Sequence, residues 1–226
     1  MDGNGRWASA RGLPRTEGHR VGIGDSVPAV VDEALDLGLR YLTMYAFSTE
    51  NWKRPVAEVR FLMNYNQEWL KEQRHRFNEK GVRVRFIGRR TDRRLPRRLV
   101  RLAEETEELT AGNRKLDLTI ALNYGGRAEV VTAVRHLAKL VEKGELEPAK
   151  ISERDIARHL FAPEVPDPDL IIRTSGEMRV SNFLLWQGAY AELYFTDTLW
   201  PDFRGQQLRD AIAEYQRRSR RFGGVE

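Results

Sequence analysis

Short apolar segments alternate along this chain with longer segments of helical periodicity, and this alternation limits its possible folds more than any other feature. One apolar stripe runs from Val130 to Val141 at helical spacing, and another runs through residues 57–80 and ends at Gly81. The segments that favour strands are residues 39–47, 82–88, 116–124, 169–174 and 192–195. Strands and helices in this order are typical of an α/β domain with a mainly parallel central sheet flanked by helices.

The composition is that of a globular domain. The chain has 226 residues, 41% of them hydrophobic, and no Pro/Gly/Ser-rich linker, so we expect a single domain over residues 1–226. It contains no cysteine, which excludes disulfides, thiolate catalysis and thiolate metal sites. No apolar run reaches the roughly 20 residues of a membrane-spanning helix, and the polar start does not resemble a signal peptide, so the expected location is the cytoplasm. The formal net charge of +5 indicates an anionic partner.

The first block of chemistry-bearing residues opens the chain. It comprises Asp2, Gly3, Asn4, Gly5, Arg6 and Trp7, and Arg15 and His19 follow it. Glycines let backbone N–H groups approach a phosphate closely, and an arginine guanidinium can bind two phosphate oxygens at once. The carboxylate of Asp2 would bind a metal ion or act in acid–base chemistry. The alternative interpretation is an ordinary Asp-Gly and Asn-Gly turn near a frayed terminus.

A second block directly follows the strand-like segment that ends at Phe47. It comprises Ser48, Thr49, Glu50, Asn51, Trp52, Lys53, Arg54 and Pro55. The alternative interpretation is a helix cap, with Ser48 or Thr49 at the N-cap and Pro55 as the first helical residue. Capping accounts for one serine and one proline, but it does not account for Asn51, Trp52 or Arg54.

A third block lies near the end of the fourth strand-like segment. Arg173 and Arg179 are six residues apart, with hydroxyl groups and a glycine between them and Ser181 beyond, which favours a diphosphate clamp. The alternative is a turn whose arginines pair with Glu177 or with surface acids. Glu192 stands among aromatic residues, where it either caps a strand end or is a buried functional carboxylate.

Two other features carry less weight. The arginine-rich tract from Arg83 to Arg101 suggests nucleic-acid binding, but glutamates follow at helical spacings, which favours a solvated, ion-paired surface. Residues 122–127 form a strand–turn–helix junction, which we interpret as structural. Taken together, the blocks indicate two phosphorylated ligands and a hard divalent cation such as Mg²⁺, and the absence of a Walker loop argues against a nucleotide hydrolase. The apolar surroundings indicate that the rest of a ligand is apolar.

These blocks resemble, in order and spacing, the signature blocks of the cis-prenyltransferases, most closely those of bacterial undecaprenyl and decaprenyl diphosphate synthases. The resembling segments are residues 1–7, 18–19, 45–55, 123–127, 173–177 and 192–195. The resemblance implies a homodimer with a parallel sheet and a hydrophobic tunnel between sheet and helices. It implies Mg²⁺-dependent condensation of isopentenyl diphosphate onto an allylic diphosphate, such as farnesyl diphosphate, with Z double bonds and a polyprenyl diphosphate product. It also implies cytoplasmic location, with transient membrane-surface contact for product release.

The resemblance also assigns roles by position. Asp2 matches the catalytic aspartate that acts with Mg²⁺, Asn51 matches the residue linked to proton removal, and Glu192 matches a second metal-linked acid. The residues that match the allylic diphosphate site are Gly3, Asn4, Gly5, Arg6, Trp7, Arg15 and His19. The residues that match the substrate loop are Ser48, Thr49, Glu50, Trp52 and Arg54. The residues that match the isopentenyl diphosphate site are Arg173, Arg179 and Ser181.

The chain departs from the family pattern at its start. Family members carry an apolar strand before the Met-Asp-Gly block, which here begins the chain, so we expect the sheet to lack its first strand and Asp2 to lie on a frayed terminus. A non-catalytic subunit of a heteromeric prenyltransferase is an alternative, and so is nucleic-acid binding through residues 83–101. The retention of Asp2, Arg6, His19, Arg173, Arg179 and Glu192 argues against a non-catalytic subunit.

Overall fold

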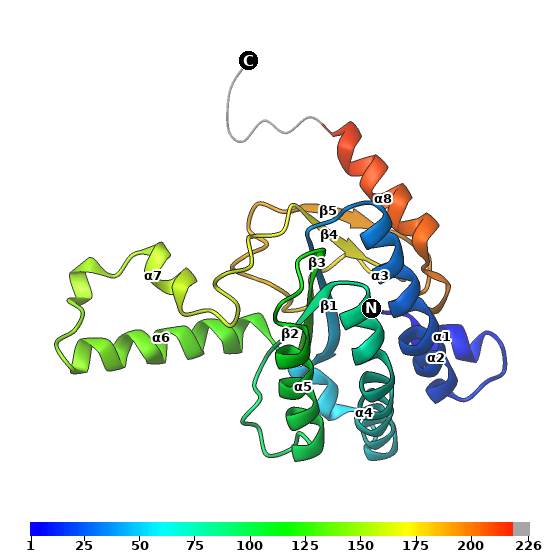
Figure 1. Cartoon of the computed structure of the whole chain (residues 1–226), viewed down its shortest axis with the longest axis horizontal. Coiled ribbons are helices and arrows are strands. Elements are labelled where there is room, and N and C mark those ends of the chain that lie inside the picture. The colour runs from blue at the N-terminus through cyan, green and yellow to red at the C-terminus, as the bar shows by residue number, and fades with distance from the viewer. Residues whose placement is uncertain (219–226) are drawn as a thin grey trace.

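Three parallel strands form the larger sheet of the computed structural model, which describes residues 1–218 (Figure 1). They are β1 (Tyr41–Ser48), β2 (Val82–Ile87) and β3 (Leu116–Tyr124), in the spatial order β1-β3-β2. Two further strands, β4 (Leu170–Arg173) and β5 (Glu192–Phe195), pair in parallel as a second sheet. The ends of all five lie within two residues of the predicted strands, so the mainly parallel α/β fold is confirmed.

Helices flank these strands and connect most of them. The α-helices are α1 (Asn4–Ser9), α2 (Arg15–Val21), α3 (Val27–Asp36), α4 (Val56–Glu79), α5 (Arg97–Thr110), α6 (Gly126–Glu142), α7 (Glu153–Arg158) and α8 (Gly205–Arg217). The shorter helical turns are η1 (Gly22–Ser26), η2 (Thr49–Lys53), η3 (Pro148–Lys150) and η4 (Trp200–Asp202). The apolar periodicity of residues 57–80 correctly predicts α4, and Gly81 follows it at φ 76°, a left-handed conformation that glycine adopts without strain. None of the helices in residues 1–218 has both the length and the apolar character needed to cross a bilayer.

The central strand β3 is buried along its whole length because it pairs with a strand on each edge and is covered on both faces. Leu116, Leu118, Ile120 and Leu122 face the main core, which α3, α4 and α5 supply with apolar side chains. In Figure 1, α4 and α5 lie side by side against the sheet. This packing fixes β3, and the parallel register then aligns the carboxyl ends of its neighbours.

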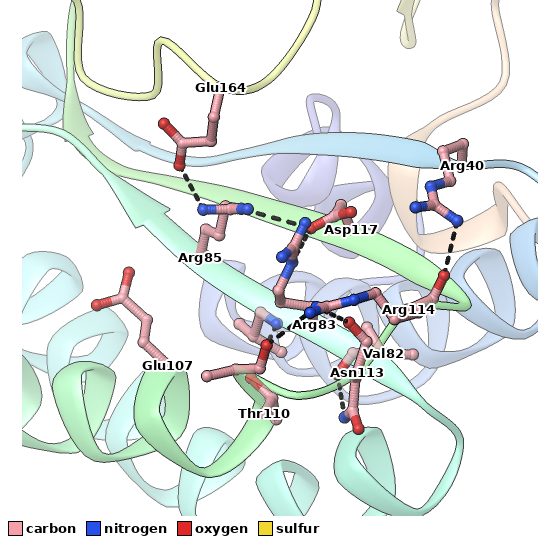
Figure 2. A network of polar contacts seen from close by, with 12 residues as sticks. Arg40, Val82, Arg83, Arg85, Glu107, Thr110, Asn113, Arg114, Asp117 and Glu164 are labelled. Carbon is pink, nitrogen blue, oxygen red and sulfur yellow. Dashed lines mark hydrogen bonds and ion pairs between the residues drawn. The ribbon is translucent and has the colours of Figure 1, made fainter.

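Figure 2 shows that the other face of β3 carries a buried acid. Asp117 lies between two residues of the main core, so its side chain points to the opposite face, where Arg83 and Arg85 of β2 form ion pairs with it. Arg85 also pairs with Glu164. Burial alone would raise the pKa of Asp117, but the two guanidinium groups hold it below its usual value.

Ion pairs also engage three further arginines of the arginine-rich tract. Arg101 pairs with Glu105 at 3.0 Å, four residues ahead on α5, as the helical spacing predicts. Arg90 donates to Glu107 at 2.7 Å, and Arg94 pairs with an aspartate two residues before it. The prediction of an ion-paired surface is therefore confirmed for these arginines.

An apolar slot separates the two sheets. A cavity of about 360 Å³ is lined by β1 on one side, by β4 on the other, and by Met1. Leu42 and Met44 line it, and so do Tyr41, Thr43 and Tyr45, although these two sets point to opposite faces of β1. The cavity therefore lies in the plane of the sheet, between the edges of β1 and β4 that do not pair with β3 or β5. Helices α3 and α8 also line it, through Val30, Leu208 and Ile212, so the cavity extends from the strand edges to these helices.

The slot between β1 and β4 allows a test of whether the first strand of the family pattern would fit there. An apolar, β-branched segment of five residues fused ahead of Met1 is expected to pair with β1 and β4 and to join the two sheets. The added burial and hydrogen bonds should raise the free energy of unfolding by about 2 kcal/mol, which raises the melting temperature by about 4–8 °C. Calorimetry and amide hydrogen exchange of β1 and β4 measure this. A Ser/Gly extension of the same length is the control, and equal melting temperatures for the two extensions would contradict the prediction.

Candidate active site

Asp2 lies at the carboxyl end of β4, where its contacts fix both its main chain and its carboxylate. Its Oδ2 accepts a hydrogen bond from Arg173 Nη2 at 2.8 Å, and its Oδ1 accepts one from the Gly3 N–H at 2.8 Å. Its own N–H donates to Thr174 Oγ1 at 3.0 Å. Burial alone would raise the pKa of Asp2, but the Gly3 N–H and the Arg173 guanidinium outweigh it, so the pKa lies below its usual value. The structure thus brings the first and third blocks together around an ionised carboxylate.

The turn after Asp2 depends on close approaches that side chains would obstruct. Gly3 has φ 102°, and a Cβ there would lie 2.9 Å from Leu199 Cδ2. A Cβ on Gly18 of α2 would lie 1.9 Å from the carbonyl oxygen of Asn4, so α1 and α2 can pack only with glycine at this position. Arg6 extends from α1 to the third block and donates to Ser175 Oγ at 2.6 Å. The turn therefore has a defined place in the fold, which contradicts the frayed terminus expected for Asp2.

A buried glutamate that the sequence reasoning missed gathers three of the expected site residues. Glu58, in the first turn of α4, is 7% exposed. It accepts hydrogen bonds from Arg15 Nε at 3.2 Å, from Arg54 Nη1 at 3.1 Å and from His19 Nε2 at 3.1 Å. Burial alone would raise the pKa of Glu58, but its hydrogen bonds and the two guanidinium charges hold it below its usual value. Burial also lowers the pKa of His19, although the hydrogen bond to Glu58 acts in the opposite direction.

One sequence signal could have identified Glu58. It stands four residues before Leu62 and therefore lies on the apolar face of α4, where a carboxylate needs partners. Arg54, four residues before Glu58, is the partner that local spacing indicates. Arg15 and His19, which also donate hydrogen bonds to Glu58, lie on α2. Their contacts with α4 could not be predicted from spacing along the sequence.

The second block forms the turn η2 between β1 and α4. Ser48 caps this turn, and its N–H donates to Asn51 Oδ1 at 3.0 Å in a capping box, so the capping interpretation is correct for Ser48 and also accounts for Asn51. Pro55 directly precedes α4 and is not its first residue. Trp52 Nε1 donates to Asn123 Oδ1 at 2.7 Å. Capping thus accounts for Asn51 as well as Ser48, which the sequence analysis did not expect. Trp52 instead forms a hydrogen bond to the carboxyl end of the central strand β3.

The third block contains one half-buried and one exposed arginine. Arg173, whose side chain is 16% exposed, pairs with Asp2, and its Nη1 donates to the carbonyl oxygen of Arg179 at 3.0 Å. Arg179 forms an ion pair with Glu177, as the alternative interpretation expects. Ser175 and Ser181 have φ values of 75° and 46°, which is left-handed backbone in residues other than glycine. These residues hold the turn in a conformation that ordinary loops avoid.

Glu192 does not join the other acid. The register of β4 and β5 pairs Glu192 with Leu170 and Phe195 with Arg173, so Glu192 lies at the opposite end of the strand pair from Asp2. Its carboxylate pairs with Arg218 Nη1 at 2.8 Å. Within residues 1–218, no three His, Asp or Glu side chains form a ready metal site. Of the two acids that the resemblance links to a metal, Asp2 fits the usual Mg²⁺ arrangement, in which one or two carboxylates hold the ion together with substrate phosphate oxygens.

Taken together, guanidinium groups outnumber the carboxylates that contact them, five to three, at the carboxyl ends of the strands. Arg6, Arg15, Arg54, Arg173 and Arg179 contribute guanidinium groups, and the acids that contact them are Asp2, Glu58 and Glu177. The Arg15 guanidinium lies against Gly5, which joins the Glu58 cluster to the turn after Asp2. Such an arrangement binds polyanions with several charges and stabilises a departing anionic group.

Comparisons with known proteins agree with this geometry. The family model for undecaprenyl diphosphate synthase matches residues 1–223. Isoprenyl transferase 2 of Corynebacterium glutamicum is 52% identical over 225 residues, covering 100% of this chain and 91% of that protein. The trans,polycis-polyprenyl diphosphate synthase ((2Z,6E)-farnesyl diphosphate specific) of Thermobifida fusca is 52% identical over 226 residues, covering 100% of this chain and 79% of that protein. The crystal structure of lavandulyl diphosphate synthase from Lavandula x intermedia with dimethylallyl diphosphate superposes with a TM-score of 0.94 at 36% identity, over 99% of this chain and 95% of that chain.

The Glu58 cluster generates a pH-dependent prediction. Glu58→Gln removes the charge that three donors share, and it should lower the free energy of unfolding at pH 7 by about 2 kcal/mol. Because the folded-state pKa of Glu58 lies below its ordinary value of 4.5, the stabilisation is present above pH 4.5 and is lost as the pH falls through the folded-state value. The difference in stability between the wild type and the variant should therefore shrink in acid.

Thermal melts of the wild type and the variant from pH 7 to pH 3.5 measure that difference. Glu17→Gln is the matched control, because Glu17 forms an exposed pair with Arg20 on α2 and should change stability by less than about 1 kcal/mol. A difference in stability that stays constant over the whole pH range would contradict the role of the Glu58 charge.

Proposed function

This chain belongs to the undecaprenyl diphosphate synthase family of cis-prenyltransferases, and we propose that it condenses isopentenyl diphosphate onto an allylic diphosphate to make a polyprenyl diphosphate. The new double bonds have Z geometry, and farnesyl diphosphate is a suitable allylic substrate. The observation that carries the proposal is the convergence of Asp2 with five arginines at the carboxyl ends of the strands. Two diphosphate groups carry several negative charges, and the five guanidinium groups would offset a large part of them.

The allylic diphosphate would bind against the turn that follows Asp2. The residues proposed for this site are Gly3, Asn4, Gly5, Arg6, Trp7, Arg15 and His19, with Ser48, Thr49, Glu50, Trp52 and Arg54 of the substrate loop. The support is the Glu58 cluster, which holds guanidinium groups from α2 and from the loop within reach of one anion. Isopentenyl diphosphate would bind to Arg173, Arg179 and Ser181, which share the turn after β4.

The proposed reaction breaks the bond between the allylic C1 and its diphosphate oxygen. The double-bond electrons of isopentenyl diphosphate form the new carbon–carbon bond, and a proton leaves its C2. Mg²⁺, held by Asp2 and diphosphate oxygens, would supply charge neutralisation to the leaving group. The guanidinium groups add to that neutralisation in a site from which an apolar lining excludes water.

Two groups could accept the proton that leaves C2 of isopentenyl diphosphate, the Asn51 amide and a diphosphate oxygen. The resemblance links Asn51 to proton removal, but an amide is a weak base, and its Oδ1 already accepts the Ser48 N–H at 3.0 Å. We therefore propose that a diphosphate oxygen takes the proton and that Asn51 keeps the substrate loop in shape. The role of Glu192 as a metal ligand gains no support from its pairing with Arg218.

Partners of the chain are also part of the proposal. A homodimer is supported by α6, which projects from the side of the molecule in Figure 1 and exposes Val131 and Val134, 47% and 50% accessible. The growing hydrocarbon would run in a tunnel between sheet and helices. The apolar product would leave by transient contact with a membrane surface.

Product analysis tests the proposed activity directly. The protein is incubated with Mg²⁺, labelled isopentenyl diphosphate and allylic diphosphates of several lengths, and the products are separated by length. Elongated polyprenyl diphosphates with Z double bonds are the expected result. The absence of any elongation with every primer would overturn the proposal.

Asp2→Ala is expected to lower kcat by about 10²–10³-fold, because both the metal and the leaving-group charge depend on this carboxylate. Steady-state kinetics at saturating Mg²⁺ measure it. Asp36→Ala, which changes an exposed aspartate at the end of α3, should leave kcat unchanged. Near-normal turnover of Asp2→Ala would show that Asp2 does not act in the reaction.

The two diphosphate sites should be separable by kinetics. Arg179→Ala should raise KM for isopentenyl diphosphate about tenfold with little change in kcat, because Arg179 is exposed and contacts only Glu177 among the acids of residues 1–218. Arg173→Ala should raise the same KM and also lower kcat, because it frees the Asp2 carboxylate. Arg15→Ala should act through KM for the allylic substrate.

Lysine substitutions at the same three positions are the controls, since they keep the charge and lose the fork of donors. Equal shifts of both KM values in all three alanine variants would contradict the division into two sites.

A further inference from the structure

Asn123 occupies an unusual position at the end of β3. It is completely buried and has φ 52°, a left-handed conformation that asparagine adopts more readily than most residues. Every polar atom of its side chain is used. Oδ1 accepts from Trp52 Nε1 at 2.7 Å, and Nδ2 donates to the carbonyl oxygen of Arg89 at 3.1 Å and to Asp92 Oδ2 at 3.2 Å. One amide therefore links the substrate loop to the segment between β2 and α5.

The residue type is dictated by these contacts. An indole N–H can only donate, so Asn123 must present an oxygen to Trp52, and Asp92 can only accept when ionised. Arg94 beside Asp92 holds the pKa of that carboxyl well below its usual value. An acceptor on one side and a donor on the other are what a primary amide supplies.

Trp52 is held by three contacts. Besides the hydrogen bond to Asn123, its ring meets the edge of Phe47 at a centroid distance of 4.9 Å, and the Arg94 guanidinium lies 4.8 Å from its ring centroid. Arg94 is in turn paired with Asp92 at 2.7 Å. Trp52 belongs to η2, so these contacts fix the turn that carries residues 48–54.

We propose that Asn123 is a positioning residue that holds Trp52, and with it the substrate loop, in the conformation that binds the diphosphates. Its effect on catalysis rests on the proposed function, since the loop is part of the proposed substrate site. The hold itself exists without substrate, because both the donor and the acceptor belong to the protein. Asp92 and Arg94 complete the support from the segment between β2 and α5.

Two single variants and their combination test the proposal. Asn123→Gly keeps the left-handed backbone and removes the amide, and Trp52→Phe keeps an aromatic ring and removes the N–H donor. Each should lower kcat/KM for the allylic substrate about tenfold, and the double variant should lose little more than either single one. Losses that multiply in the double variant would overturn the link between the two residues.

Hydrogen exchange supplies a readout that needs no catalysis. In the substrate-free protein, peptides that cover residues 48–54 should exchange faster in both single variants than in the wild type, whereas peptides of α6 should not change. Unchanged exchange in residues 48–54 of Asn123→Gly would overturn the proposal. If the wild type showed no elongation activity, the proposed function would be overturned. Hydrogen exchange of residues 48–54 would still decide whether Asn123 holds Trp52 in place.

Exchanging the donor and the acceptor tests whether the hydrogen bond between positions 123 and 92 itself holds the loop. Asn123→Asp still accepts from Trp52 but places a second carboxylate against Asp92, so it should exchange faster in residues 48–54 and lose activity. Combining it with Asp92→Asn removes the repulsion between carboxylates and restores the hydrogen bond between positions 123 and 92, but not the one to the Arg89 carbonyl oxygen. The combination should therefore recover part of the slow exchange and part of the activity. Asp92→Asn alone is the control. A combination no better than Asn123→Asp alone would contradict the paired geometry.

Discussion

The arrangement of the molecule depends on the burial of β3. This strand has neighbours on both edges and apolar cover over most of both faces, so its position is the most constrained in the chain. Parallel pairing from Tyr41 with Asp117 to Ser48 with Tyr124 then fixes where β1 ends. The proposed substrate loop, residues 48–54, begins at that end, and Asn123 stands beside it on β3. The site is therefore a consequence of register, because a slip of one residue would turn every side chain of β1 to the other face.

Charge compensation is the second principle of the site. Arginines that could bind diphosphates are paired with carboxylates of the chain itself, through Asp2, Glu58 and Glu177. Such pairing keeps mutually repelling guanidinium groups close together, although the partial desolvation of each pair offsets part of its Coulomb gain. A diphosphate that binds there, as we propose, would compete with those carboxylates for the same donors. Binding would then be an exchange of anions, with a smaller free energy than the number of arginines suggests.

Local sequence patterns predicted the strands well and the side-chain pairings poorly. Strand ends at residues 116–124 and 192–195 agree with the structure, because alternation and flanking polar residues are local signals. The ion pair between Asp2 and Arg173, 171 positions apart, had no local signal in the sequence. Glu192 was included because it stands among aromatic residues and matches a metal-linked acid of the family, but it begins its strand. Periodicity identifies a strand without saying which of its ends meets the site.

The residues that sequence reasoning missed share a physical reason. Glu58 and Asn123 act through contacts with elements distant in sequence, and neither has a local motif beyond a helix face or a strand end. Asn123 lay in a segment interpreted as structural, and its contacts show how a structural residue can support a loop of functional importance. A buried polar residue needs a hydrogen-bond partner, so a polar residue on an apolar face predicts a contact. The sequence does not identify the partner, because that residue can be distant along the chain.

The slot between β1 and β4 has a consequence for colloidal behaviour. Two strand edges that pair with no other strand of residues 1–218 face each other across an apolar cavity. A fluctuation that moves the β4–β5 pair away from the larger sheet would expose both edges together with the apolar residues of the slot. Exposed edges of this kind pair with strands of other molecules and begin aggregation. Resistance to aggregation in this protein is therefore set by the free energy of separating its two sheets, which is smaller than that of unfolding the whole chain.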